Sequence, residues 1–179
     1  MAQNPARNNK IMNFMKQNKV VDDINEDIYS ESIIERKIEL RFDRMYNNVE
    51  KTFLKYLSRN VEGKCHKEGF IKKNSSTILS YTSGELKGDK IMYTVVFKCK
   101  VCYPYEGMVV HCKVINITKI GIKAVVSTEN NPMVLFVSRE HNGHIDFENF
   151  DRDDKIKVRV IGFRFEVNDE YLSVLGEII

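Results

Sequence analysis

The first clear hydrophobic pattern in the chain is a strand pattern followed by a helix pattern. Ile34, Ile38 and Leu40 alternate with charged residues over 32–42, which predicts a strand with one buried face. Apolar positions then recur at helical spacing: Tyr46, Val49, Phe53 and Leu57, with Leu54 and Tyr56 beside them. We expect this helix to be capped by Asp43 and to end near Asn60.

Residues 61–102 are broken into short apolar runs by glycines, which predicts a small β meander. The strand candidates are 70–71, 78–81 and 91–102. The order strand, helix, strands predicts a compact α+β domain over residues 28–102. Residues 1–27 are polar, rich in asparagine and without a period, which indicates a mobile N-terminal extension.

Residues 103–179 show no helical period and predict an all-β domain. Five strands are expected, at 108–117, 122–128, 133–138, 155–165 and 171–178. Turns are expected at Gly121, Asn130-Asn131-Pro132, Asn142-Gly143 and Asn168-Asp169. Five short strands fit a small closed barrel such as the OB-fold, whose exposed strands often bind single-stranded nucleic acid. The alternative is another small β-barrel or sandwich that serves only as a protein docking surface.

Composition and charge narrow the class of protein. The N-terminus lacks a signal-peptide pattern, and no apolar run is long enough to span a bilayer, so we expect an intracellular protein with reduced cysteines. Residues 1–102 hold 19 basic and 13 acidic residues, whereas residues 103–179 hold 9 and 12. Any nucleic-acid affinity of the C-terminal half should therefore come from a local patch and be sensitive to salt.

Several short segments resemble one protein family in order and spacing. Tyr103-Pro104-Tyr105-Glu106-Gly107, followed by a valine-rich strand, is similar to the domain junction of the stalk subunit of multisubunit RNA polymerases. That family includes the seventh-largest subunit of RNA polymerase II and its archaeal counterpart. Residues 61–71 are similar to its tip segment, and residues 131–137 resemble its Gly-Pro-Met strand. The resemblance spans roughly residues 30–165.

The resemblance implies a non-catalytic stalk subunit with two domains. A tip domain would dock on the polymerase core subunits, and an OB-fold domain of the ribosomal protein S-one type would touch nascent RNA. A helical stalk partner subunit is also implied. The Asn- and Ile-rich composition suits a large DNA virus or a protist, so the expected location is the nucleus for a cellular protein and the cytoplasm or virion for a viral one. The candidate docking residues are Glu62, Gly63, Lys64, His66, Lys67, Gly69 and Phe70.

RNA contacts are predicted on or beside the barrel strands, where cations can meet phosphates and an aromatic ring can stack on a base. The candidates are Lys113, Lys123, Phe136, Arg139, His141 and Arg159. For Phe136 the continuous apolar run of residues 135–137 favours a core position instead. The family often has an aromatic residue just after the glycine that opens the second barrel strand. Ile122 and Lys123 stand there, which predicts weaker RNA binding.

Catalytic and metal-binding interpretations have little support in the sequence. Cys99 and Cys102 could begin a zinc site, but they lie three apart in a predicted strand and should point to opposite faces. The acidic cluster at residues 151–154 is typical of a solvated turn. We therefore expect no cofactor and no enzyme activity. A free-standing single-stranded RNA-binding OB protein is the first alternative, and a metal-dependent enzyme the second.

Overall fold

The computed structural model describes residues 28–41, 48–127, 132–143 and 145–179. The described part is mostly β, with one α-helix and a closed five-stranded barrel. The chain divides into two compact units. We call Tyr29–Tyr103 with Arg164–Leu172 the helix-bearing unit, and Pro104–Phe163 with Ser173–Ile179 the barrel unit. The predicted extension at residues 1–27 lies outside the described residues.

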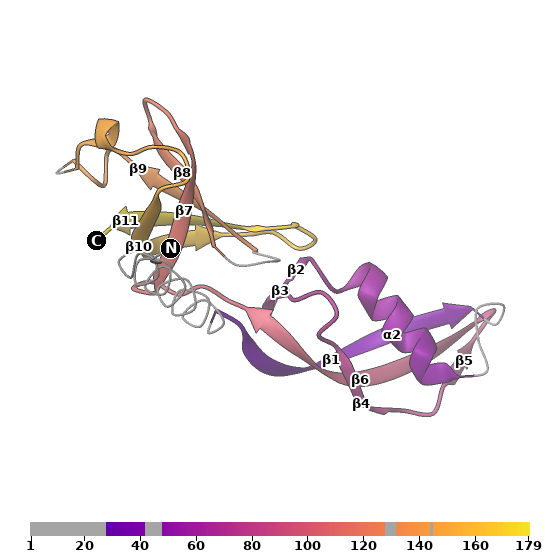
Figure 1. Cartoon of the computed structure of the whole chain (residues 1–179). Coiled ribbons are helices and arrows are strands. Elements are labelled where there is room, and N and C mark those ends of the chain that lie inside the picture. Colours follow the sequence, from indigo (N-terminus) through magenta and orange to yellow (C-terminus); the bar gives the residue numbers. More distant parts are fainter. Residues whose placement is uncertain (1–27, 42–47, 128–131, 144) are drawn as a thin grey trace, which may run out of the picture. The chain divides into compact units, whose positions relative to one another are not determined.

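The sheet of the helix-bearing unit is built around one long central strand, β6 (Lys90–Cys102). β1 (Ser30–Arg41) runs antiparallel to β6 along its whole length, with Ile38 opposite Tyr93. Three short strands pair with the other side of β6, as Figure 1 shows. They are β3 (Gly69–Ile71), β4 (Thr77–Tyr81) and β5 (Glu85–Lys87), and β2 (Cys65–His66) pairs with β3.

The helix α2 (Val49–Asn60) covers one face of this sheet (Figure 1). Phe53 and Leu57 are fully buried there and belong to one core cluster with Ile38 of β1. Asn48 caps the helix by accepting a hydrogen bond from the backbone N–H of Lys51. The predicted end at Asn60 is confirmed. The predicted cap Asp43 is wrong, because α2 begins at Val49 and Asn48 caps it. Asp43 and the apolar residues Phe42 and Tyr46 lie outside the described residues.

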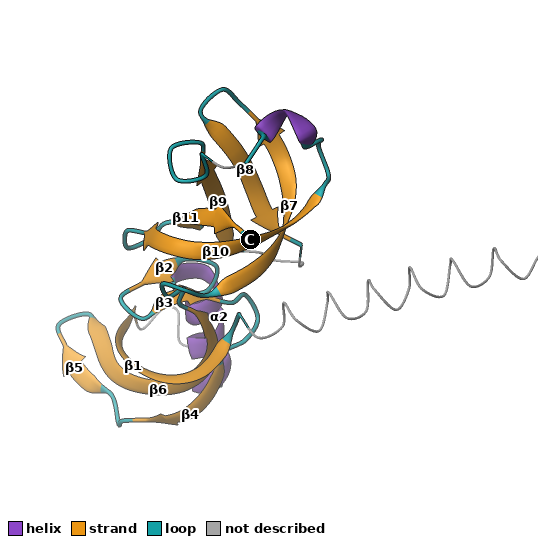
Figure 2. Ribbon diagram, turned by 90° about the vertical axis from the view of Figure 1, so that its left-hand side faces the viewer, coloured by secondary structure: helices purple, strands orange, loops and turns teal. Residues whose placement is uncertain are grey.

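The barrel unit closes five strands in the order β7-β8-β9-β11-β10, with β10 returning to pair with β7 (Figure 2). This closure leaves no free sheet edge in the barrel and matches the arrangement of an OB-like barrel. The predicted five-stranded barrel is confirmed at this level. Its strands are β7 (Val109–Ile117), β8 (Gly121–Val126), β9 (Met133–Ser138), β10 (Lys155–Arg164) and β11 (Leu172–Ile178).

Three details differ from the sequence predictions. Phe136 is 44% exposed, so its predicted core position is wrong: Leu135 and Val137 fill the barrel, and strand alternation turns the residue between them outward. Leu54 was expected to widen the buried stripe of α2 but is 40% exposed, so that stripe is narrower than predicted. The short strands β2 and β5 and a 3₁₀ turn at Phe147–Asn149 were not predicted, since two or three residues carry no detectable period.

Within the described residues, no helix combines the length and apolar character that a membrane crossing requires.

Candidate nucleic-acid interface

The outer face of β7, β8 and β9 gathers cations around one exposed aromatic ring. Strand pairing aligns Lys123 of β8 between Asn116 of β7 and Phe136 of β9. Directly opposed residues of an antiparallel pair share a face, so these side chains form one row across the sheet. Lys113 of β7 lies in the neighbouring row of the same face, opposite Val125 of β8. We call this surface the barrel face.

Lys123 and Phe136 form the centre of the barrel face. The Lys123 ammonium nitrogen lies 5.9 Å from the centroid of the Phe136 ring, within the range of a cation–π contact. The ring remains 44% exposed, so a flat base can still cover it. The aromatic ring of the barrel face therefore lies on β9, the third barrel strand, opposite Lys123 of β8. A cation that can meet phosphate lies directly beside it.

A groove of about 250 Å³ runs beside this pair and was not predicted from the sequence. Ile120, in the turn between β7 and β8, is 81% exposed at its edge. Gly121 then passes close to the Val137 carbonyl, where a Cβ atom would clash. The sequence signal that could have indicated this groove is Ile120, an apolar residue placed in a turn next to Gly121. The other polar lining comes from Asn116, Thr118 and Ser138.

The remaining predicted RNA contacts are less concentrated. Lys113 pairs with Asp153 at 2.9 Å, and Arg159 of β10 lies 3.8 Å from Glu177. Arg139 follows β9 and places its guanidinium 5.0 Å from the Phe147 ring centroid. His141 is exposed two residues later. The structure therefore brings Lys123 and Phe136 together, with Lys113 one row away. The RNA-binding roles of all six residues stay predictions.

The predicted docking residues lie in and beside the β2–β3 hairpin, and most are buried. Glu62 is 6% exposed, and its carboxylate accepts hydrogen bonds from three successive backbone N–H groups, at 2.8, 3.1 and 2.9 Å. Those donors are Asn74, Ser75 and Ser76. Glu62 therefore organises the following loop and is turned away from the surface.

The other docking candidates divide between packing and exposure. Gly69 has a φ of +116°, and a Cβ atom there would lie 2.5 Å from the Cys102 carbonyl oxygen. Phe70 is buried, and Gly63 is buried in a left-handed conformation. His66 is half-buried and holds its ring Nε2 3.0 Å from the Val61 carbonyl. Of the seven, Lys67 alone is exposed, and Lys64 is half-buried.

The four cysteines are free thiols buried in the two units. Burial raises the pKa of Cys112 and of Cys102 to about 12, and the pKa of Cys65 and of Cys99 to about 11. These groups are therefore protonated at neutral pH and poor nucleophiles. Among the described residues, no three His, Cys, Asp or Glu side chains converge in a way that could hold a metal ion.

Comparison with known proteins relates the chain to a viral protein. No protein-family model matches the chain. The chain is 22% identical over 169 residues to a protein of Acanthamoeba polyphaga mimivirus that is named as a candidate DNA-directed RNA polymerase subunit. The match covers 85% of this chain and 82% of the viral protein. It supports a relationship to RNA polymerase subunits across both units.

A solved structure of an uncharacterized protein from Methanocaldococcus jannaschii also matches in part. It covers 43% of this chain and 95% of that protein, at 19% identity and a TM-score of 0.35. A similarity of this size carries no argument about function.

Proposed function

We propose that the chain is a non-catalytic stalk subunit of a DNA-directed RNA polymerase. The observation that carries this proposal is the similarity to the mimivirus protein, which extends over 85% of the chain and therefore includes both units. Two further observations support the stalk assignment: the resemblance of the junction at residues 103–107 and the order of the barrel strands. The helix-bearing unit would act as the tip domain, and the barrel as the ribosomal protein S-one type domain. The protein would be located where its polymerase works.

The helix-bearing unit would hold the polymerase core through the exposed part of the β2–β3 hairpin. Lys67 and Lys64 are the accessible cations there, while the buried Glu62 and Gly69 fix the backbone that presents them. The contact would thus depend on a rigid loop whose shape is set from within the unit. A helical stalk partner would complete the assembly.

The barrel face would bind nascent RNA weakly. Phe136 offers one stacking surface, worth about 1–3 kcal/mol per base, and Lys123 offers one adjacent phosphate contact. One aromatic ring and few free cations give modest affinity that falls with salt. Such a surface suits a subunit that guides a transcript already tethered to the polymerase.

The deciding experiment is purification of the tagged full chain from native cells or infected extract, with bound proteins identified by mass spectrometry. Recovery of the two largest polymerase subunits in near-equal amounts is the expected result. Recovery of RNA or ribosomal proteins without polymerase would instead establish a free-standing RNA-binding protein. Lys64→Glu/Lys67→Glu should reduce polymerase recovery, whereas Lys51→Glu/Lys87→Glu, with the same change in charge on exposed positions, should not.

A further inference from the structure

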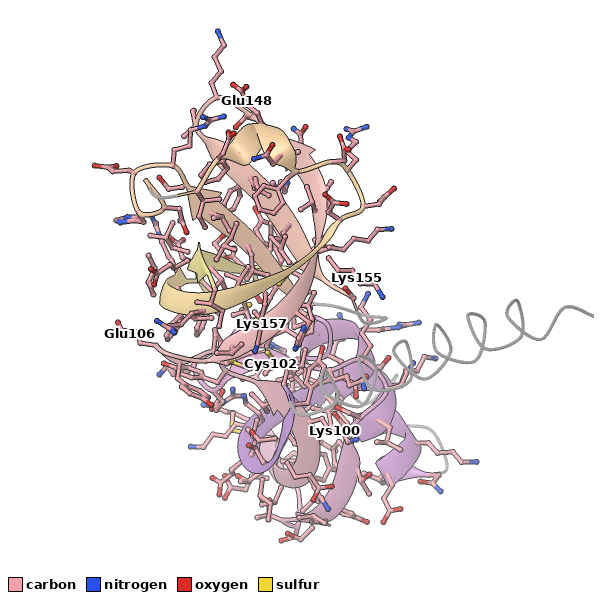
Figure 3. All side chains as sticks on the ribbon, turned by 60° about the vertical axis from the view of Figure 1, so that its left-hand side comes forward. Lys100, Cys102, Glu106, Glu148, Lys155 and Lys157 are labelled. Atoms are coloured by element: carbon pink, nitrogen blue, oxygen red, sulfur yellow. The ribbon has the colours of Figure 1, made fainter. Side chains whose placement is uncertain are left out.

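A positively charged groove lies entirely within the helix-bearing unit. It has a volume of about 470 Å³. Four lysines and a single carboxylate, Glu31, line it. We call it the lysine groove; its lysines are Lys72 and Lys73 of the loop after β3, and Lys98 and Lys100 of β6. Lys100 is labelled in Figure 3.

The two strand lysines are held on one face of the sheet. Lys98 and Lys100 are two residues apart on β6, while Cys99 and Val101 between and after them are buried on the opposite face. Residues at this spacing rise about 6.6–6.8 Å along a strand, which is comparable to the distance between successive phosphates of an extended single strand. Both ammonium groups therefore face the same ligand path.

The backbone of the loop that carries Lys72 and Lys73 is held by a hydrogen-bond network that reaches β6. The Ser75 hydroxyl donates to the Lys72 carbonyl at 2.7 Å and accepts from the Lys100 backbone N–H at 3.1 Å. The Lys72 N–H donates to the Lys100 carbonyl at 2.8 Å. Together with the three N–H bonds to Glu62, these contacts join the loop to the strand. The backbone of the groove is therefore preorganised, and ordering on binding is confined to the lysine side chains.

The charges of the groove are incompletely compensated. Glu31 pairs with Lys98 at 2.7 Å, and this hydrogen bond lowers the pKa of the Glu31 carboxyl. Lys72 lies 4.9 Å from the Tyr29 ring centroid, a contact that leaves its charge unneutralised. Within the described part of the chain, Lys73 and Lys100 make no ion pair. The groove thus keeps a net positive charge directed at solvent.

We infer that the lysine groove binds the phosphodiester backbone of single-stranded nucleic acid, as a second contact separate from the barrel face. Lysine binds phosphate as a compact point charge, and Lys98 and Lys100 stand at a spacing that matches successive phosphates. The carboxylates of an acidic protein are the competing ligand, which the poly-glutamate readout below distinguishes. Among the described residues that line the groove none is aromatic, so we expect it to follow the nucleic-acid backbone without reading bases. The inference deepens the proposed function, on which its biological role rests.

The test measures salt-dependent binding of a fluorescein-labelled oligouridine of about 20 nucleotides to the full chain by anisotropy. Lys73→Gln/Lys100→Gln should lower the slope of log affinity against log salt by about 1.4, because each lysine–phosphate contact contributes about 0.7 for a single strand. If the two chains bind with equal affinity near 1 M salt, this slope difference makes the affinity of the variant about 25-fold lower at 0.1 M salt. Lys51→Gln/Lys87→Gln removes the same charge elsewhere and should leave the slope unchanged.

Three further readouts separate the outcomes. Bound RNA should protect Lys73 and Lys100 of the unmodified chain from acetylation, a result that does not depend on how a variant folds. Equal losses for RNA and for DNA of matched sequence support phosphate recognition, whereas a loss confined to RNA would overturn backbone-only binding. Equal slope changes in both variants, or protection by poly-glutamate and not by RNA, would also overturn the inference.

Failure of this inference can be distinguished from failure of the proposed function. The Lys73→Gln/Lys100→Gln chain should still recover polymerase, because Lys64 and Lys67, the proposed docking cations, are unchanged. A chain that binds RNA through the lysine groove but never recovers polymerase would refute only the stalk assignment. A chain that recovers polymerase but shows no slope change would refute only the groove.

Discussion

Replacing Glu62 tests whether a buried carboxylate shapes the surface of the helix-bearing unit. Its two oxygens accept three backbone N–H groups, from Asn74, Ser75 and Ser76. Leaving a buried donor without a partner costs about 1–3 kcal/mol, and water can reach part of this loop. We therefore expect Glu62→Ala to lower the free energy of unfolding by about 2–4 kcal/mol.

The Glu62→Gln variant keeps the shape of the side chain and removes its negative charge. A glutamine oxygen in the place of Oε1 can still accept from Ser75 and Ser76, but its NH₂ group then faces the Asn74 N–H, which is also a donor. We expect this variant to lose about 1–2 kcal/mol, less than Glu62→Ala. The exposed Glu85→Ala on β5 is the matched control and should be near neutral.

Urea unfolding followed by far-ultraviolet circular dichroism gives the global effect, and hydrogen exchange at residues 74–76 gives the local one. A local loss of about 2 kcal/mol corresponds to about 30-fold faster exchange of these amides. Equal midpoints for Glu62→Ala and Glu85→Ala, with the loop amides still protected, would refute the reasoning. If polymerase recovery were lost at unchanged stability, Glu62 would instead be a direct docking residue.

Three other perturbations test the barrel face, the hairpin and the thiols. Phe136→Ala should weaken oligouridine binding by about 5- to 150-fold and leave the free energy of unfolding unchanged, because the ring is exposed. Phe136→Tyr should retain binding. Equal affinities of the unmodified chain and both variants would exclude stacking. Gly69→Ala should cost more than about 1 kcal/mol in urea unfolding because of its positive φ and the nearby Cys102 carbonyl, whereas Gly162→Ala, in open space, should cost less. Burial raises the pKa of Cys112 from 9.0 to about 12, so the folded state keeps a proton that the unfolded state loses. Stability should therefore fall as pH rises above 9.0, more gently in Cys112→Ala; a decline equal in both chains would contradict this cause.

Local patterns in the sequence determined most of the secondary structure. The alternation of Ile34, Ile38 and Leu40 predicted β1, and the helical spacing of Phe53 and Leu57 predicted α2, because one buried face imposes a period on each element. The barrel strands were predicted for the same reason. The very short strands β2 and β5 were not predicted, because they are held by pairing with neighbouring strands and have no period of their own.

The candidate sites depended on tertiary structure, because strand register and burial are long-range properties. Lys123 and Phe136 were both chosen from the sequence, but only the pairing of β8 with β9 places the ammonium beside an exposed ring. Glu62 shows the opposite case: the resemblance of residues 61–71 suggested a docking contact there, yet the Glu62 side chain is buried and accepts three N–H groups from residues 74–76. The lysine groove likewise needs Lys73 and Lys100, distant in sequence, to be joined through Ser75. The sequence determined which elements form, and the folded chain decided which side chains meet, since a hydrogen bond or a cross-strand contact is fixed by position in space.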